Sequence, residues 1–324
     1  MITTHDDLPH PVPPIAYLRY KENWFFLIID VSNNVYGMAH FNCEPGHDRA
    51  RFSCNLMVNN EIIKYGVQVP FPVDFAYSKQ IGDDKLKVRF VEPHKQIDMS
   101  LHSEAVDLDM SFFGYAPTFD YQNADAANPD KPAPHEIVSF GTNQMFHHMQ
   151  QAMTIAGTLK VKTGKSAGAN ITLKGMGYRD HSRAMRADNF TFKHVWSFLY
   201  FPKTIFGVMT ITGSLRQRTA TNSGYVHDAD GTRALKDIVI TNHGDIGGNM
   251  PSKVEFRLTD VYGKAFTVIA DIEHRMGYVP LITEQPDSSG FLYNIVENFA
   301  PLSLLESGET GYSLVEIGYQ VKKV

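Results

Sequence analysis

The stretch Lys85-Leu-Lys-Val-Arg-Phe90 alternates polar and apolar residues one by one. Three further stretches, which begin at residues 107, 169 and 253, repeat this pattern. Successive side chains of an extended strand point to opposite faces, so each stretch gives one apolar face and one polar face. Turn-forming sequences such as Asn59-Asn60 and Asp230-Gly231 punctuate the chain. The pattern therefore predicts an all-β protein built from antiparallel hairpins.

A short internal repeat suggests how these strands are organised. Trp24-Phe-Phe-Leu27 is echoed by Trp196-Ser-Phe-Leu199, and each stretch is followed by an aromatic residue and a glycine. Antiparallel sheets with one apolar face hide that face and their free edges by closing into barrels. We therefore expect two tandem antiparallel β-barrel domains packed against each other, over residues 1–170 and 171–324. The repeat is short enough to arise by chance.

Charge and hydropathy exclude several partners. The formal net charge is -5 and no long Lys/Arg run is present, whereas nucleic-acid binding depends on cationic groups. The longest early apolar run, residues 24–29, is far shorter than the ~20 residues that span a bilayer. Residues 1–14 lack the pattern of a signal peptide. We therefore expect a cytoplasmic protein with no transmembrane segment and no nucleic-acid partner.

The residues that could bind a metal do not form a recognisable site. Cys43 and Cys54 lack the Cys-x-x-Cys spacing of zinc and redox sites, and they predict reduced thiols rather than a disulfide. The adjacent His147 and His148 point to opposite faces of a strand. Residues 228–231 resemble the start of a calcium loop, but Val239 stands where that loop needs Glu. We expect neither a metal nor an organic cofactor.

The densest polar stretch is Gly175-Met-Gly-Tyr-Arg-Asp-His-Ser-Arg-Ala-Met-Arg-Ala-Asp188. It lies between a predicted strand and the second Trp-bearing strand, so we expect it at the junction of the two halves. Gly175 and Gly177 permit a tight turn or a close approach of the backbone. A dinucleotide-binding loop would need a third glycine and a βαβ unit, and neither is present.

This stretch resembles the Gly-x-Gly-x-Arg-Asp-His-Ser-Trp-Gly signature of the AttH-like proteins, relatives of the carotenoid 1,2-hydratases in the lipocalin-like calycin group. Weaker matches begin at Glu22, Gly224 and Gly311. The resemblance implies two lipocalin-like barrels with a hydrophobic ligand near their interface, and activities that hydrate isoprenoid double bonds or cyclise polyenes without a cofactor. Arg183-Ala184 replaces the Trp-Gly of the signature, so the exact substrate and reaction are not carried over.

Hydration of an alkene needs an acid that protonates carbon, a wall that tolerates a cation, and a base. We predict Asp180 as the acid and His194 or His181 as the base. His194-Val-Trp196 resembles the His-x-Trp element of the carotenoid hydratases, and residues two apart in a strand share a face. Trp196 and Tyr225 are predicted to form the wall.

The candidate substrate-binding residues are Tyr178, Arg179, Arg183, Trp196 and Phe198. Structural roles compete with these functional ones, because Asp180 can instead bind an arginine at the interdomain turn and Trp196 can plug a barrel as Trp24 does. The leading hypothesis is a cofactor-independent hydratase, dehydratase or cyclase that acts on a hydrophobic isoprenoid or polyene. The alternative is a non-catalytic carrier of lipid or terpenoid. The sequence leaves open whether the chain forms a homodimer.

Overall fold

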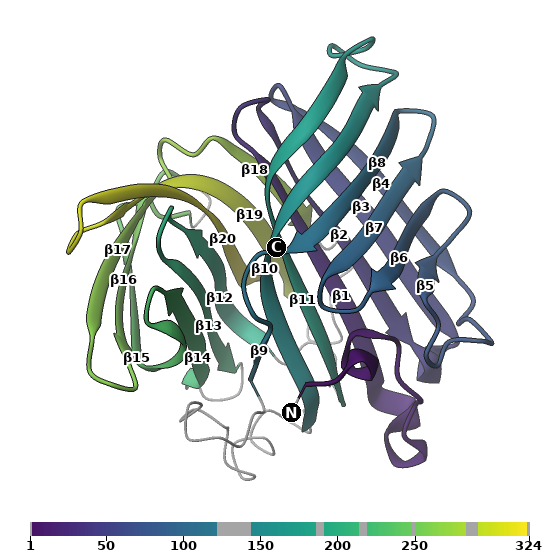
Figure 1. Cartoon of the computed structure of the whole chain (residues 1–324), viewed down its shortest axis with the longest axis horizontal. Helices are drawn as coiled ribbons and strands as arrows, with labels where there is room; N and C mark the ends of the chain where they lie inside the picture. Colours follow the sequence, from purple (N-terminus) through teal and green to yellow (C-terminus); the bar gives the residue numbers. More distant parts are fainter. Residues whose placement is uncertain are drawn as a thin grey trace. The chain divides into compact units, whose positions relative to one another are not determined.

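A computed structural model describes residues 2–121, 144–185, 191–213, 219–247, 250–282 and 291–322 (Figure 1). The predicted all-β class is confirmed, since the helices in these residues are the short 3-10 segments η1 (Thr4–Asp7), η2 (Pro14–Arg19) and η3 (Pro45–His47). No helix of the described residues is long and apolar enough to cross a membrane. The loop predicted over residues 115–134 lies mostly outside the described residues.

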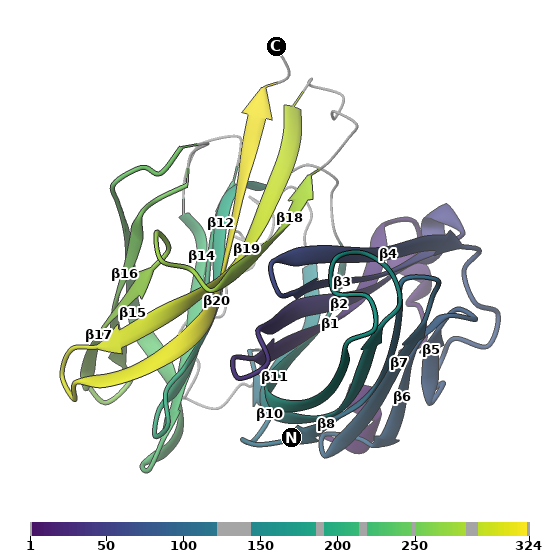
Figure 2. The same cartoon turned by 90° about the horizontal axis from the view of Figure 1, so that it is seen from above.

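The chain divides into two compact units, and unit 1 comprises Met1–Asp120 with Asn143–Arg186. Its strands are β1 (Tyr20–Asp30), β2 (Val35–Glu44), β3 (Arg49–Val58), β4 (Glu61–Val69), β5 (Gln80–Gly82), β6 (Leu86–Glu92), β7 (Gln96–His102), β8 (Val106–Gly114), β9 (Phe119–Asp120), β10 (Gln144–Val161) and β11 (Asn170–Met185). They form one antiparallel sheet in the order β4-β3-β2-β1-β11-β10-β8-β7-β6-β5, with β9 beside β10. The end strands β4 and β5, as described, do not pair, so the sheet curls without closing (Figure 2).

The inner face of the curled sheet carries the core of unit 1. Burial alternates residue by residue along β6, as the sequence predicted. Leu8 from the N-terminal segment packs in this core, and the indole Nε1 of Trp24 donates a hydrogen bond to the carbonyl of Asp7 at 3.3 Å. Cys43 and Cys54 are buried here as free thiols. The largest fully buried aromatic side chains of the core are Trp24, Phe26, Phe41, Phe52, Phe90 and Phe112.

The predicted turn at Asn59-Asn60 is confirmed. Val58 and Glu61 are partners in the β3–β4 ladder, so these two asparagines form a two-residue hairpin loop. Their φ angles are 50° and 66°. Two positive φ angles match the primed turns that fit the twist of antiparallel strands, and asparagine tolerates that conformation.

Unit 2, which comprises Tyr121–Thr142 with Ala187–Val324, holds a closed antiparallel barrel. Its strands are β12 (Thr191–Tyr200), β13 (Ile205–Gly213), β14 (Thr219–Asp228), β15 (Gly231–His243), β16 (Lys253–Asp260), β17 (Ala265–Asp271), β18 (Gly277–Ile282), β19 (Phe291–Leu304) and β20 (Glu309–Lys322). Their order is β17-β16-β15-β14-β13-β12-β20-β19-β18. An additional pairing of β17 with β19 closes the strands from β17 to β19 into a ring of eight, and β18 lies outside that ring. The core includes Leu199, Phe206, Phe256, Val268 and Ile317.

The division between the units differs from the boundary expected at residues 170 and 171. It falls after Arg186, because β11 pairs along its length with β1 and β10 of unit 1. The strand that carries the Arg-Asp-His-Ser motif therefore belongs to unit 1. Hydrogen-bond pairing between strands distant in the sequence decides this assignment, and the short internal repeat gave no information about it.

The two Trp-bearing strands differ in the face that carries the indole. Trp24 of β1 lies in the core of unit 1. In β12, Val195 and Leu199 lie in the core of unit 2, so Trp196 points to the opposite face of the barrel wall. The sequence repeat does not correspond to equivalent positions. A side chain that plugs the interior of its sheet is consistent with the position of Trp24, but not with that of Trp196.

Candidate functional site

Strand β11 distributes the predicted site residues over its two faces. Trp24, a core residue, is the ladder partner of His181, so His181 also points inward. Arg179, two residues earlier, shares this face, whereas Tyr178 and Asp180 point outward. By the same alternation, Arg183 lies on the inner face. The structure therefore separates Asp180 from the two arginines that flank it and from His181.

The inner face holds a buried network around Glu22 of β1. Its Oε1 accepts hydrogen bonds from His10 Nδ1 at 2.8 Å and from His181 Nε2 at 2.9 Å. Its Oε2 accepts from the His10 backbone N–H at 3.1 Å and from the Tyr20 hydroxyl at 2.9 Å. Burial opposes ionisation, but the hydrogen bonds from the two histidines lower the pKa of Glu22 to about 2. Glu22 is therefore a carboxylate at neutral pH.

Burial also lowers the pKa of His181, so its neutral imidazole donates from Nε2 to Glu22. His10, Glu22 and His181 offer ligand atoms within 4.8 Å of one another. Two histidines and a carboxylate can bind zinc or iron. However, the histidine nitrogens already bond to the carboxylate that would be their co-ligand. The group has the geometry of a hydrogen-bonded core network.

Arg179 is the centre of a second inward network. Its guanidinium forms an ion pair with Asp7 and donates from Nε to Gln151 at 3.0 Å. A terminal nitrogen lies 2.8 Å from His94 Nδ1 and 3.2 Å from the Thr118 hydroxyl. The Arg179 side chain is 1% exposed. These contacts join the N-terminal segment to β10 and β11, and they favour a structural role for Arg179.

The outer face of β11 brings Asp180 into a cluster with residues of β10. Asp180 Oδ2 lies 2.5 Å from His148 Nε2 and accepts a hydrogen bond from Gln150 Nε2 at 2.8 Å. The Tyr178 hydroxyl donates to Gln150 Oε1 at 2.5 Å. We call Tyr178, Asp180, His148 and Gln150 the Asp180 cluster. The contact between Asp180 and His148 requires one proton between the two atoms, and the Asp180 side chain is 14% exposed.

Unit 2 contains a separate cluster around His194 of β12. The imidazole Nε2 bonds to Glu316 of β20 and Nδ1 bonds to the Tyr293 hydroxyl of β19. The rings of His194 and Tyr293 are stacked, with centroids 5.7 Å apart. Glu297 of β19 is the ladder partner of Glu316. We call His194, Tyr293, Glu297 and Glu316 the His194 cluster.

The predicted aromatic wall lies on the same face of unit 2 as His194. Trp196 and Phe198 alternate with core residues of β12 and share the face of His194. The ladder connects Phe198 through Gly207 of β13 to Tyr225 of β14, so Tyr225 lies on this face as well. Trp196, Phe198 and Tyr225 are 7%, 0% and 1% exposed. The prediction that His194 and Trp196 share one face is confirmed.

Sequence reasoning did not assign a role to several members of these clusters. The sequence singles out His148 only as a possible metal ligand beside His147, and Tyr293 and Glu297 belong to no recognisable motif. Glu316 ends the stretch that begins at Gly311 and matches the AttH-like proteins, which is the only signal for it. Their partners come from strands far away in the sequence, and residue spacing does not show such contacts.

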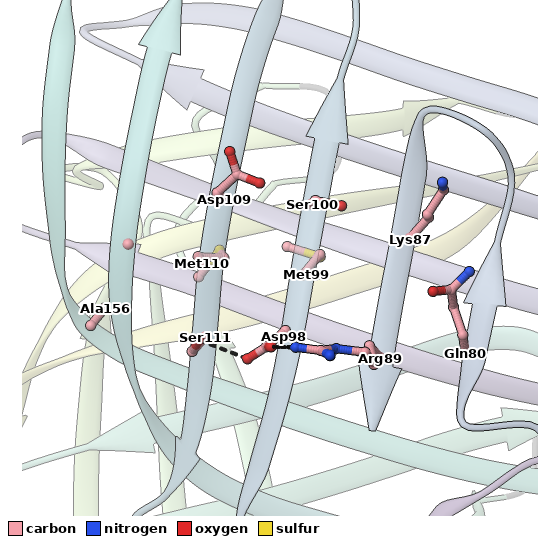
Figure 3. Close-up of a pocket in the computed structure, with 11 residues that line it drawn as sticks. Gln80, Lys87, Arg89, Asp98, Met99, Ser100, Asp109, Met110, Ser111 and Ala156 are labelled. Atoms are coloured by element: carbon pink, nitrogen blue, oxygen red, sulfur yellow. Dashed lines mark hydrogen bonds and ion pairs between the residues drawn. The ribbon is translucent and has the colours of Figure 1, made fainter. Parts of the chain in front are cut away.

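A cavity of about 400 Å³ lies elsewhere, on the polar face of unit 1 (Figure 3). Arg89 donates to Asp98 at 2.6 Å, and the Ser111 hydroxyl donates to Asp98 at 2.8 Å. This cavity is lined by residues of β5 to β8 and β10, and it contains none of the predicted site residues. We assign it no part in the function.

A closed eight-stranded barrel and a curled antiparallel sheet, in tandem, define the two-domain lipocalin-like class of proteins. The chain belongs to the family described as "Domain of unknown function (DUF7064)", whose model matches residues 3–320. No curated protein sequence matches this one.

Solved structures are similar over nearly the whole chain. Kievitone hydratase from Nectria haematococca is 14% identical with a TM-score of 0.62, and the match covers 95% of this chain and 93% of that one. An AttH-like protein from Nitrosomonas europaea is 11% identical with a TM-score of 0.60, and 92% of each chain is covered. CghA is 11% identical with a TM-score of 0.62, over 99% and 96% of the chains. At these identities the similarity is one of fold, and it confirms the AttH-like fold that the sequence motif implied.

Proposed function

We propose that this protein is a cofactor-independent lyase or isomerase, of the hydratase, dehydratase or cyclase type, that acts on an isoprenoid or similar polyene lipid. In this chemistry, an acid protonates a substrate carbon, an aromatic wall stabilises the resulting cation, and a base accepts a proton. Asp180 is the proposed acid and His194 the proposed base. Trp196 and Tyr225 are the proposed wall.

The observation that carries this proposal is the position of His194 beside buried aromatic side chains. The imidazole is held at both nitrogens, by Glu316 and by Tyr293. It shares its strand face with Trp196 and Phe198, which are almost fully buried. In such surroundings water screens charge poorly, so an acid-base group acts strongly and an indole face can stabilise a cation.

The Asp180 cluster is a candidate for a second proton-transfer group. Within this cluster, His148 Nε2 and Asp180 Oδ2 lie 2.5 Å apart. A proton held between two such atoms can be released by one and recovered by the other. Gln150 orients the carboxylate by a further hydrogen bond. These contacts support Asp180 as a candidate acid and add His148 as its partner.

The similar structures favour an enzyme over a carrier. Kievitone hydratase is a hydratase by name, and CghA is also similar in a structure with Sch210972, at a TM-score of 0.60. The substrate class proposed for this chain rests on the AttH-like motif at residues 175–182 and on the aromatic wall. The free thiols of Cys43 and Cys54 agree with the proposed cytoplasmic location.

The test is incubation of the full chain with isoprenoid hydrocarbons and alcohols in heavy water. A hydratase or cyclase incorporates deuterium at the protonated carbon, and mass spectrometry of the product detects it. His194→Gln and Asp180→Asn are each expected to lower incorporation by about 100-fold or more while the protein stays folded. If the isoprenoids bind but acquire no deuterium, the protein is a carrier and the proposed enzymatic function is wrong.

A further inference from the structure

Two glutamates of the His194 cluster face each other directly. Glu297 of β19 and Glu316 of β20 are ladder partners, so their side chains lie on the same face of the barrel wall. Glu297 is 0% exposed, and in the described part of the chain no donor bonds to either of its carboxyl oxygens. An ionised carboxylate in that position would be buried without a partner, which is strongly unfavourable.

The two carboxyl groups therefore differ in charge. Glu316 accepts a hydrogen bond from His194 Nε2, so its ionised form has a partner. Burial and the neighbouring charge of Glu316 raise the pKa of Glu297 well above its ordinary value. Glu297 consequently keeps its proton at neutral pH. A protonated Glu297 can donate a hydrogen bond to the Glu316 carboxylate, which explains why two glutamates tolerate this arrangement.

We propose that Glu297 and Glu316 share one proton across the β19–β20 ladder, and that this pair is the counter-charge that holds His194 with its proton on Nε2. This inference rests on the proposed role of His194 as the base. Glu297 acts through Glu316 and is a positioning residue. A proton on Nε2 leaves Nδ1 as the acceptor nitrogen, which is the atom that a neutral base uses.

Tyr293 completes the chain of hydrogen bonds on the other side of the imidazole. Burial raises the pKa of Tyr293, so its hydroxyl stays protonated and donates to Nδ1 of His194. When a substrate or water gives up a proton, the Tyr293 oxygen can accept it while its own proton passes to Nδ1. The imidazolium that forms is balanced by Glu316, and the shared proton of the glutamate pair stays in place.

Few other ionisable groups face this pair from the described strands. Glu316, His194 and Tyr293 are the ones that the ladders and contacts place around Glu297. On the other side of β19, the ladder partner of Glu297 is the apolar Val279 of β18. Among these groups, Glu316 is the one that bonds to Nε2 of His194.

Two matched substitutions test the inference without any substrate. Nitrogen-15 NMR of the full chain shows which imidazole nitrogen of His194 carries the proton, and His194→Gln identifies the His194 signals. Glu316→Gln removes the charged acceptor of the Nε2 proton and is expected to lower the fraction of neutral His194 that carries its proton on Nε2. Glu297→Gln replaces a protonated carboxyl by an amide that also donates to Glu316, so this fraction is expected to stay at its wild-type value.

The same two variants can overturn the inference. If Glu297→Gln lowers the Nε2-protonated fraction as much as Glu316→Gln does, Glu297 is charged and the shared proton does not exist. If Glu316→Gln leaves that fraction unchanged, Glu316 is not the counter-charge.

Infrared spectroscopy supplies a readout that does not need Glu316→Gln to fold. The wild type should show the carbonyl band of a protonated carboxylic acid at neutral pH, and Glu297→Gln should lack it. A wild-type spectrum without that band contradicts the inference. Because neither measurement involves turnover, failure of the proposed enzymatic function would be seen separately, as an absence of deuterium incorporation.

Discussion

Gly318 of β20 lies directly opposite His194 of β12 in the barrel ladder. A Cβ atom on residue 318 would overlap Cε1 and Nδ1 of the imidazole, and it would lie 2.7 Å from the Tyr293 hydroxyl oxygen. The imidazole therefore occupies the space that a side chain at position 318 would fill. The glycine lets His194 reach Glu316 and Tyr293 at the same time.

Gly318→Ala is expected to displace the imidazole while leaving every ionisable group of the cluster in the chain. Displacements of about 1 Å in a catalytic group can cost about 100-fold in rate, so we expect a loss of that order in deuterium incorporation. The His194 NMR signal should shift as well. Gly66→Ala is the control, because a Cβ at Gly66 has no neighbour within 4 Å. Equal rates in the two variants would contradict the positioning role of Gly318.

Asp180→Asn is expected to lower turnover by about 100-fold or more, because an amide cannot exchange a proton with His148. Asn retains the shape of the side chain and can still accept a hydrogen bond from Gln150, so the unfolding temperature should change little. Deuterium incorporation and thermal unfolding measure the two effects. Asp109→Asn, an exposed position on β8, is the matched control. Full turnover of Asp180→Asn would eliminate Asp180 as the acid.

The stability of unit 1 should fall at acidic pH in two steps. The pKa of His181 is below its ordinary value of 6.5, so the unfolded chain takes up a proton first and stability begins to fall below pH 6.5. Glu22 has a pKa of about 2 against an ordinary value of 4.5. Its contribution is fully present above pH 4.5 and is lost as the pH falls toward 2. Urea unfolding at a series of pH values measures both steps.

Glu22→Gln should lower the free energy of unfolding at pH 7 by about 3 kcal/mol, because the buried histidines lose their charged acceptor. The variant should also lose most of the pH dependence between pH 4.5 and pH 2. Glu104→Gln, at an exposed position, should behave like the wild type. An unchanged acid profile in Glu22→Gln would show that Glu22 is not the group responsible.

Gly177→Ala should destabilise unit 1 by overpacking its core. A Cβ at Gly177 would lie 2.7 Å from Cγ2 of Ile155 and 2.8 Å from Cδ1 of Phe112. Excess volume in a packed core costs about 1 to 3 kcal/mol, and urea unfolding measures this loss against Gly66→Ala. If the two variants are equally stable, the glycine has another function.

The glycines before the polar motif show how far the sequence could be interpreted. They were expected to permit either a tight turn or a close approach of the backbone. A Cβ at Gly175 would overlap the backbone carbonyl of Ile29 on β1, so close approach is the reason for that glycine, and residues 175–182 are all strand. The choice depended on the β1–β11 ladder, which joins residues about 150 positions apart and which no local pattern shows.

The candidate site was predictable only in part, for the same reason. The shared face of His194 and Trp196 follows from their spacing of two residues in a strand. The partners of His194 cannot be inferred from spacing, because Glu316 is 122 residues away in the sequence. Likewise, Asp180 could be singled out from its motif, but its contact with His148 depends on the register of β10 against β11.

The sequence by itself determined the β class, the faces of individual strands and the hairpin turns, because alternation and turn conformation depend on neighbouring residues. It also identified the AttH-like motif. Only the tertiary structure decided that the motif belongs to unit 1, that Asp180 and His181 point to opposite faces, and that two glutamates lie side by side near His194. These features depend on strand register and barrel closure, which bring strands distant in the sequence together. Register and closure are stabilised by contacts across the whole sheet, and no short segment contains that information.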